Sequence, residues 1–218
     1  MKKLWFVLFA LLPGWALAAP AVPHAPAPAP RPVVLDAAAR ADIARIEDYW
    51  RAITTMRADF TQIAPDESVS YGRFYLQRPG RLRFEYDPPA ALLLVSRRGI
   101  LTMIDYDLRQ VTRWPVKETP LKFLLGRSLN LTRDAVITRL DRGTDRLSIT
   151  LMTSQDARDG FITLVFSYAP FQLRYWEVTD SQGLVTRISF TNLVINQPLD
   201  AALFTYKDPR PEVHRRKR

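Results

Sequence analysis

The sequence predicts a mainly β (α+β) protein, a single incomplete antiparallel β-barrel of about ten to eleven strands with helices closing its apolar cavity. Segments that alternate polar and apolar residues recur from residue 57 to residue 195, turn residues separate most of them, and helical patterns are few. Consecutive strands with short links favour an antiparallel meander. A sheet this long must curl or close. We therefore expect an open barrel whose mouth is filled by the helices.

The first 18 residues have the pattern of a secretory signal peptide. Two lysines precede an apolar run from Leu4 to Trp15, and Ala16-Leu17-Ala18 offers small residues for cleavage. The run is too short to span a bilayer comfortably, which favours cleavage near Ala19 over a retained membrane anchor. The expected location of the mature chain is the periplasm.

The ends of the mature chain differ in composition from its middle. Residues 19–34 are almost entirely Ala and Pro, which indicates an extended linker without a fold of its own. The folded domain is expected over residues 35–209. Residues 210–218 form a basic tail, interpreted as solvated and disordered, with contact to anionic lipid head groups as the alternative. The net charge of +9 gathers toward the ends, whereas a nucleic-acid binder more often carries a basic stripe on its folded face.

The folded domain is expected to begin with a helix. Asp36 is a suitable N-cap, and apolar residues follow at spacings of three, four and three. That stripe consists of Ile43, Ile46, Trp50 and Ile53. Its narrow width predicts a helix lying on a sheet.

After Met56 the hydrophobic period changes to two. The clearest example is Tyr71–Pro89, where two alternating runs flank Arg78-Pro79-Gly80, the signature of a half-buried hairpin. A short helix is expected over Thr119–Gly126 and a helical turn over Asn196–Leu203. The predicted strands are Arg57–Ile63, Val69–Gln77, Arg81–Tyr86, Ala91–Ser96, Ile100–Asp105, Gln110–Trp114, Val136–Arg142, Arg146–Met152, Phe161–Tyr168, Leu173–Thr179 and Leu184–Ile195.

Residues that could carry catalysis are scarce. The chain contains no cysteine, which excludes disulfides, thiolate metal sites and acylation on cysteine. The two histidines, His24 and His214, fall in the linker and the tail, so a Ser-His-Asp site is not expected. No phosphate-binding glycine loop or metal-ligand spacing occurs. The sequence predicts no enzyme, no cofactor and no metal, and the acid pairs Asp105/Asp107 and Glu85/Asp87 are expected to cap turns or face solvent.

Large apolar side chains are the distinctive feature. The chain has eleven Phe, eight Tyr and five Trp, spread over almost every predicted strand. Any one of them fits an ordinary core, but a curled sheet with few helices leaves an apolar concave face that can hold an apolar ligand. From the alternation we predict the following lining: Trp50, Phe60, Phe74, Leu76, Leu82, Phe84, Tyr86, Leu93, Phe123, Leu124, Phe166 and Trp176.

Several segments resemble the periplasmic lipoprotein carriers of Gram-negative bacteria, the LolA family. The resemblance extends from about residue 38 to residue 213, and its strength lies in the order and spacing of the motifs. These motifs are Phe60-Thr61-Gln62, Gly72, RPGRLRFEYDPP at Arg78–Pro89, Asp105, Leu108, Gln110-Val111-Thr112, Thr119-Pro120-Leu121, Leu124-Leu125, Asp200-Ala201-Ala202-Leu203-Phe204, Pro209 and Pro211.

The resemblance implies a function. A monomeric carrier of this family accepts triacylated lipoproteins from an inner-membrane ATP-driven lipoprotein release complex and hands them to an outer-membrane lipoprotein receptor. It also implies that Arg78 is a lid latch, bonded to backbone of the lid helices, where the residues alone suggest a surface charge at a strand end. The alternative is a periplasmic lipid- or small-molecule-binding sensor or binding module on the same fold. A membrane-anchored receptor would need an acylated cysteine, which this chain lacks.

Overall fold

The computed structural model describes residues 33, 35–127, 129–152, 160–180 and 182–210. The expected signal peptide, nearly all of the Ala/Pro linker and all of the basic tail except Arg210 lie outside these residues. Val33, close to the end of the expected linker, donates a backbone hydrogen bond to the carbonyl of Ile137 at 3.0 Å. The chain therefore already touches the folded domain before the first helix begins.

Helix α1 spans Ala37–Ala52, and the Asp36 side chain caps it by accepting a hydrogen bond from the backbone N–H of Ala39 at 2.6 Å. The predicted apolar stripe is buried, because the helix lies on the sheet with this face inward. The helix ends where Ile53 becomes extended and donates back to the carbonyl of Trp50. The expectation of a capped amphipathic helix is confirmed.

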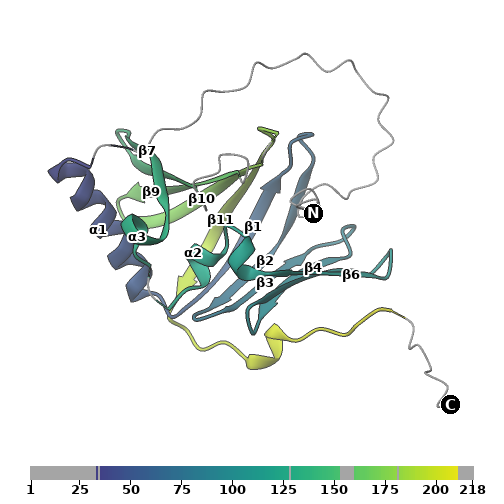
Figure 1. Ribbon diagram of the computed structural model, residues 1–218. Coiled ribbons are helices and arrows are strands. Elements are labelled where there is room, and N and C mark those ends of the chain that lie inside the picture. Colours follow the sequence, from purple (N-terminus) through teal and green to yellow (C-terminus); the bar gives the residue numbers. More distant parts are fainter. Residues whose placement is uncertain (1–32, 34, 128, 153–159, 181, 211–218) are drawn as a thin grey trace, which may run out of the picture.

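Eleven strands form one antiparallel sheet with the order β6-β5-β4-β3-β2-β1-β11-β10-β9-β8-β7 (Figure 1). The two outermost strands, β6 and β7, are not paired with each other, so the sheet stays open and the predicted fold class is confirmed. The strands are β1 Thr55–Ile63, β2 Val69–Gln77, β3 Arg81–Tyr86, β4 Leu92–Arg97, β5 Ile100–Asp105, β6 Gln110–Pro115, β7 Val136–Arg142, β8 Arg146–Met152, β9 Phe161–Tyr168, β10 Phe171–Thr179 and β11 Val185–Ile195.

The topology consists of two meanders, β1–β6 and β7–β11, joined by the pairing of β1 with β11. Register shifts occur between Arg57 and Asp59, Ile137 and Arg139, and Leu173 and Tyr175. An extra residue in a ladder bends its strand and increases the local twist. These irregularities favour the curl of the sheet seen in Figure 1.

The connection from β6 to β7 must pass from one edge of the sheet to the other. It contains the 3-10 turn η2 (Val116–Glu118), α2 (Lys122–Leu125) and α3 (Leu131–Asp134). Its apolar side chains are buried in the main core, so the connection covers the same face as α1. We call this face the inner face. The helix expected over residues 119–126 is shorter in the structure, because the residues before Lys122 are taken up by turns at Thr119 and Leu121.

The opposite, outer face of the sheet has a second, smaller core. It forms where η4 (Ala201–Phe204) packs Phe204 against Leu93, Val95 and Ile104. Leu94, the neighbour of Leu93 on β4, belongs to the main core instead. The prediction that Leu93 faces the inner lining is therefore wrong. Four consecutive apolar residues, Leu92–Val95, hide the alternation on β4, and period two places Leu93 and Val95 on the outer face.

Candidate lid and inner face

Arg78 lies in the turn between β2 and β3, and its guanidinium reaches two helices at once. Nε and Nη2 donate to the carbonyl of Gly126, at 3.1 and 2.8 Å. Nη1 donates to the carbonyl of Ile53 at 3.3 Å and also to that of Trp50. Nη2 makes a longer contact, 3.4 Å, with the carbonyl of Arg127. One side chain thus joins the C-terminal ends of α1 and α2 to a hairpin of the sheet.

The chemistry of these helix ends explains why an arginine fits between them. The last carbonyls of a helix lack partners within the helix and carry partial negative charge. Guanidinium offers five N–H donors in a planar fork, so it can serve several carbonyls together. Arg78 is half-buried, and this burial lowers the pKa of its guanidinium below the ordinary value. Because the ordinary pKa of arginine is far above neutral pH, the Arg78 side chain keeps its charge at neutral pH.

Backbone contacts support the same junction. The N–H of Arg78 donates to the carbonyl of Thr54 at 2.8 Å, and the N–H of Gly80 donates to that of Leu125 at 2.9 Å. Gly80 has φ +80, a conformation that side-chain-bearing residues rarely adopt. The hairpin tip is therefore held against both helix ends by its backbone as well as by the guanidinium.

The inner face is continuous beneath this junction. Tyr86 packs at its margin, where its hydroxyl donates to Gln62 Oε1 at 2.7 Å. Burial raises the pKa of Tyr86 well above its usual range. Ten of the predicted lining residues lie together in the buried main core: Trp50, Phe60, Phe74, Leu76, Leu82, Phe84, Phe123, Leu124, Phe166 and Trp176. Only Leu93 lies elsewhere, on the outer face.

Aromatic rings occupy the centre of this face. Phe74 lies 4.7 Å from Phe84 and 5.0 Å from Phe190, and Trp176 lies 4.8 Å from Phe190, measured between ring centroids. Phe190 is absent from the predicted lining, although Ile188 and Phe190 alternate along β11 and could have revealed it. Strands β2, β3, β10 and β11 together therefore build a floor of edge-on and tilted rings.

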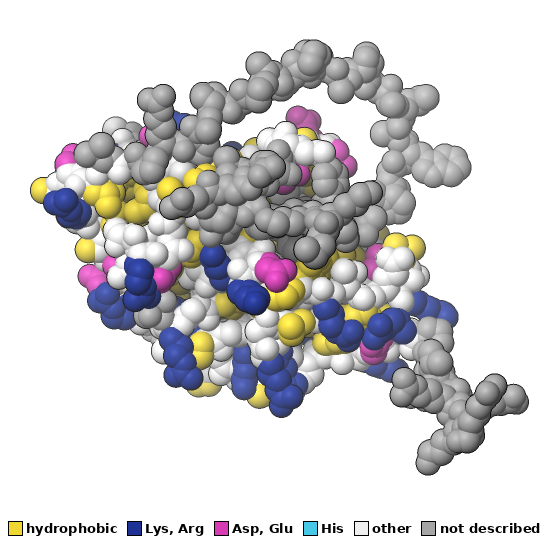
Figure 2. All heavy atoms as spheres, viewed as in Figure 1, with side chains coloured by type: hydrophobic (Ala, Val, Ile, Leu, Met, Phe, Trp, Pro, Cys, Tyr) yellow, Lys and Arg dark blue, Asp and Glu magenta, His cyan; other side chains and the backbone are white. Residues whose placement is uncertain are grey.

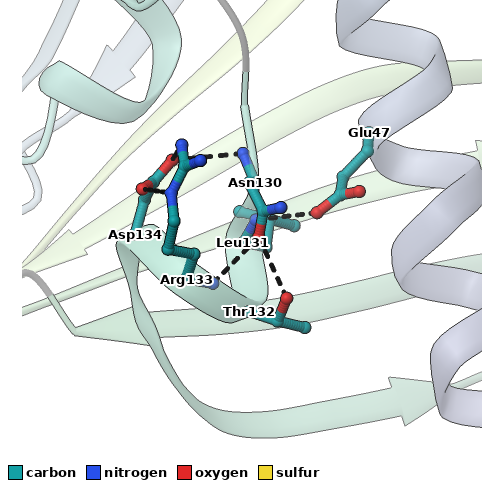
Figure 3. A network of polar contacts seen from close by, with 6 residues as sticks. All are labelled: Glu47, Asn130, Leu131, Thr132, Arg133 and Asp134. Atoms are coloured by element: carbon teal, nitrogen blue, oxygen red, sulfur yellow. Dashed lines mark hydrogen bonds and ion pairs between the residues drawn. The ribbon is translucent and has the colours of Figure 1, made fainter.

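Helix α1 is also attached to the far half of the sheet. Tyr49 accepts a hydrogen bond from the N–H of Leu173 at 3.2 Å, and Arg45 lies over the ring of Phe171 at 4.1 Å. Figure 3 shows Glu47 reaching from α1 to the start of α3, where its carboxylate accepts a hydrogen bond from the N–H of Leu131 at 2.7 Å. These contacts bind α1 to β10 and α3, independently of Arg78.

The acidic residues in the described part of the chain do not gather into a metal-binding cluster. In the described ranges no three His, Cys, Asp or Glu side chains are placed to hold a metal ion. Asp105 accepts a hydrogen bond from the N–H of Leu108 at 2.8 Å and so caps the β5–β6 turn, as predicted for that carboxylate. Glu85 pairs with Arg83 at 3.1 Å on the strand surface. Nor does any helix within these ranges combine the length and apolar character needed to cross a membrane.

Basic residues gather near the end of the molecule at which the β2–β3 turn lies. Figure 2 shows Lys and Arg side chains along the lower edge of the view, where the hairpin turns next to β2, β3 and β4 lie in Figure 1. Arg97, Lys117 and Arg127 are exposed near this end. They offer charge-matched comparisons for Arg78, which differs from them in its contacts with both helices.

The sequence is similar to those of known proteins from one family. Residues 51–207 match the family described as outer membrane lipoprotein carrier protein LolA. A protein of Methylococcus capsulatus named outer-membrane lipoprotein carrier protein is 33% identical over 175 residues, covering 76% of this chain and 83% of its own length. One of the same name from Legionella pneumophila strain Corby is 30% identical over 173 residues, covering 76% and 85%.

Among solved structures, a LolA superfamily protein from Nitrosomonas europaea matches 76% of this chain and 97% of its own, at 13% identity and a TM-score of 0.41. The family match spans most of the described domain, from the last turn of α1 to the segment after η4. The chain belongs to the LolA family. Membership in a family of carrier proteins indicates a non-enzymatic binding role.

Proposed function

We propose that this protein is a periplasmic lipoprotein carrier that buries acyl chains between its inner face and helices α1 and α2, with Arg78 as the latch of this lid. The observation that carries the proposal is the junction at Arg78. A single cationic side chain ties two helix ends to the sheet, directly above a floor of aromatic and aliphatic residues. Family membership supplies the cargo class, which is lipoproteins.

The physics of acyl chains requires such a site. Exposing an acyl chain to water is unfavourable by about 0.8 kcal/mol per CH₂, or on the order of 10 kcal/mol for one long chain. A protein that moves triacylated lipoproteins through an aqueous compartment must therefore cover the chains. The inner-face side chains are packed against α1 and α2, so cargo enters when these helices move away from the sheet. Hydrogen bonds of a charged group are worth about 1.5–3 kcal/mol each, less than one buried acyl chain offers.

Export and delivery complete the proposal. Residues 1–18 direct the chain to the periplasm and are cleaved near Ala19, and residues 19–34 serve as a spacer. The carrier takes its cargo from an inner-membrane ATP-driven release complex, travels as a monomer and delivers to an outer-membrane lipoprotein receptor. Mass spectrometry of the exported protein tests the first step, because an intact N-terminus would contradict cleavage.

A release assay tests the function. The purified mature protein is added to spheroplasts that synthesise a tagged outer-membrane lipoprotein, and the soluble fraction is examined for a one-to-one complex. We expect a soluble complex with the acylated lipoprotein and none with a version that lacks its acylated cysteine. If the lipoprotein stays on the membrane while an established carrier releases it, the carrier proposal fails, and a lipid- or small-molecule-binding module on this fold becomes the better account.

A further inference from the structure

Two polar atoms in the core have no partner. Trp50 Nε1 and Trp176 Nε1 are the buried side-chain nitrogen or oxygen atoms of the described residues that make no hydrogen bond. Both tryptophans are 1% exposed, and both belong to the main core on the inner face. Trp50 comes from the last turn of α1, whereas Trp176 comes from the middle of β10.

Unpartnered indole groups of this kind need an explanation. A buried Trp N–H usually finds an acceptor, and a buried donor without one is unfavourable relative to its hydrated state. Indole nitrogen can only donate, so neither group can be satisfied by the other. A phenylalanine would fill much of the same apolar space without leaving an N–H unpaired. Packing alone therefore does not account for two tryptophans on this face.

We propose that the two indole N–H groups bind the carbonyl oxygens through which acyl chains are attached to their lipid or lipoprotein. The inference rests on the proposed function and narrows its ligand class. An acyl chain is hydrocarbon except at the ester or amide carbonyl at its head, which is an acceptor and no donor. A carbonyl acceptor at the end of an apolar chain therefore matches an indole N–H donor in an otherwise apolar surface. The site selects acyl-linked lipids over alkyl ethers of the same length.

The two tryptophans have different roles because they stand on different elements. Trp176 is fixed in the floor by ring contacts with Phe74, Phe84 and Phe190, at 4.8 to 6.0 Å between centroids. Trp50 belongs to the lid, and its backbone carbonyl is an acceptor of the Arg78 guanidinium. Opening the lid moves the Trp50 donor away from the sheet and breaks the bond between its backbone carbonyl and Arg78. Trp176 therefore binds its carbonyl at a fixed position on the floor, whereas the Trp50 donor moves with the lid.

A binding comparison tests the site. Mature wild-type protein is titrated with dipalmitoylglycerol and with its dihexadecyl ether analogue, each competing against a fluorescent apolar probe. We expect the ester to bind about tenfold more tightly, which corresponds to about 1.4 kcal/mol. Trp176→Phe should abolish this preference by weakening ester binding more than ether binding, and Trp50→Phe should reduce the preference. Trp114→Phe, on half-buried Trp114 of β6, should preserve it.

A second readout avoids dependence on variants. Three tryptophans remain after residue 18, so ¹⁵N-labelled indole groups give three resolved resonances. The ester should shift those of Trp50 and Trp176 downfield and leave that of Trp114 in place, and the ether should shift neither in this way. Equal affinities for ester and ether with unmoved indole resonances would overturn the inference while the carrier function stands. Absence of binding by both lipids would instead count against the proposed function itself.

Discussion

Replacing Arg78 by leucine removes every side-chain bond that joins the two lid helices to the β2–β3 turn. Five hydrogen bonds to four carbonyls are lost, and the cation between two helix C-termini is lost with them. Hydrogen bonds of charged groups contribute about 1.5–3 kcal/mol each, but the half-exposed position lets water replace part of this. We expect the closed, empty state to lose about 2–3 kcal/mol in total.

This loss changes the balance between empty and loaded carrier. A latch that exists only in the closed empty state favours release of cargo, because closing recovers its bonds. Without it, loading becomes easier and emptying harder by the same factor, about 30- to 150-fold for the estimated loss. Arg78→Leu should therefore form the soluble lipoprotein complex and fail to pass its cargo to an outer-membrane receptor.

Two measurements check this prediction. Hydrogen exchange should be faster at the amides of Leu124 and Leu125 in α2, while the strands of the sheet remain protected. Transfer of tagged lipoprotein from preloaded carrier to outer-membrane vesicles should fall. Arg97→Leu removes an exposed charge near the same end and serves as the matched control. Normal loading and normal delivery by Arg78→Leu, or equal impairment by Arg97→Leu, would refute the latch.

Other predictions concern stability and the outer face. Gly72→Ala should lower unfolding stability by about 1–3 kcal/mol, because a Cβ there would lie 2.1 Å from a carbonyl of the next strand. Gly143→Ala, where the close atom belongs to a flexible side chain, should have a small effect, and thermal melting distinguishes the two. Arg83→Leu removes hydrogen bonds to two carbonyls of the C-terminal segment, at 2.9 and 3.2 Å, so amides of residues 203–205 should exchange faster while lipoprotein binding persists. Unchanged exchange would contradict this attachment. The pKa of Tyr86 is raised by burial, so folded protein keeps its phenol proton when the unfolded chain loses it. The contribution of Tyr86 to the free energy of unfolding should therefore be constant below pH 10 and fall by up to about 1.4 kcal/mol per pH unit above it. Denaturant titrations across that range measure the slope of the unfolding free energy against pH. If a Tyr86→Phe variant shows the same slope, the slope comes from groups other than Tyr86.

Local sequence patterns are sufficient to predict most of the fold. Period-two runs bounded by turn residues located the strands to within about two residues, since each strand buries one face and the alternation is regular. Asp36 located the start of α1, because capping depends on residues only three apart. The open sheet followed from the number of strands and the scarcity of helices.

The candidate site depended on contacts between distant segments, and there the sequence was less informative. Leu93 was assigned to the wrong face because Leu93, Leu94 and Val95 are all apolar, so nothing in β4 marks which residue points inward. The carbonyl partners of Arg78 lie 25 to 49 residues away in the sequence. Without the family resemblance, the residues next to Arg78 predict only a surface charge at a strand end. The unpaired indole of Trp176 is visible only once its neighbours are known.

We propose that the acyl chains of the cargo lie on the inner face of the sheet, beneath α1 and α2. Leu93 and Leu94 are adjacent on β4, both buried, and point to opposite faces. A photoreactive amino acid placed at each position, in the mature protein loaded with tagged lipoprotein, distinguishes binding on the inner face from binding on the outer face. We expect a crosslink from position 94 that requires acylation of the lipoprotein, and none from position 93. Equal crosslinking from both positions, or crosslinking from position 93 alone, would contradict it.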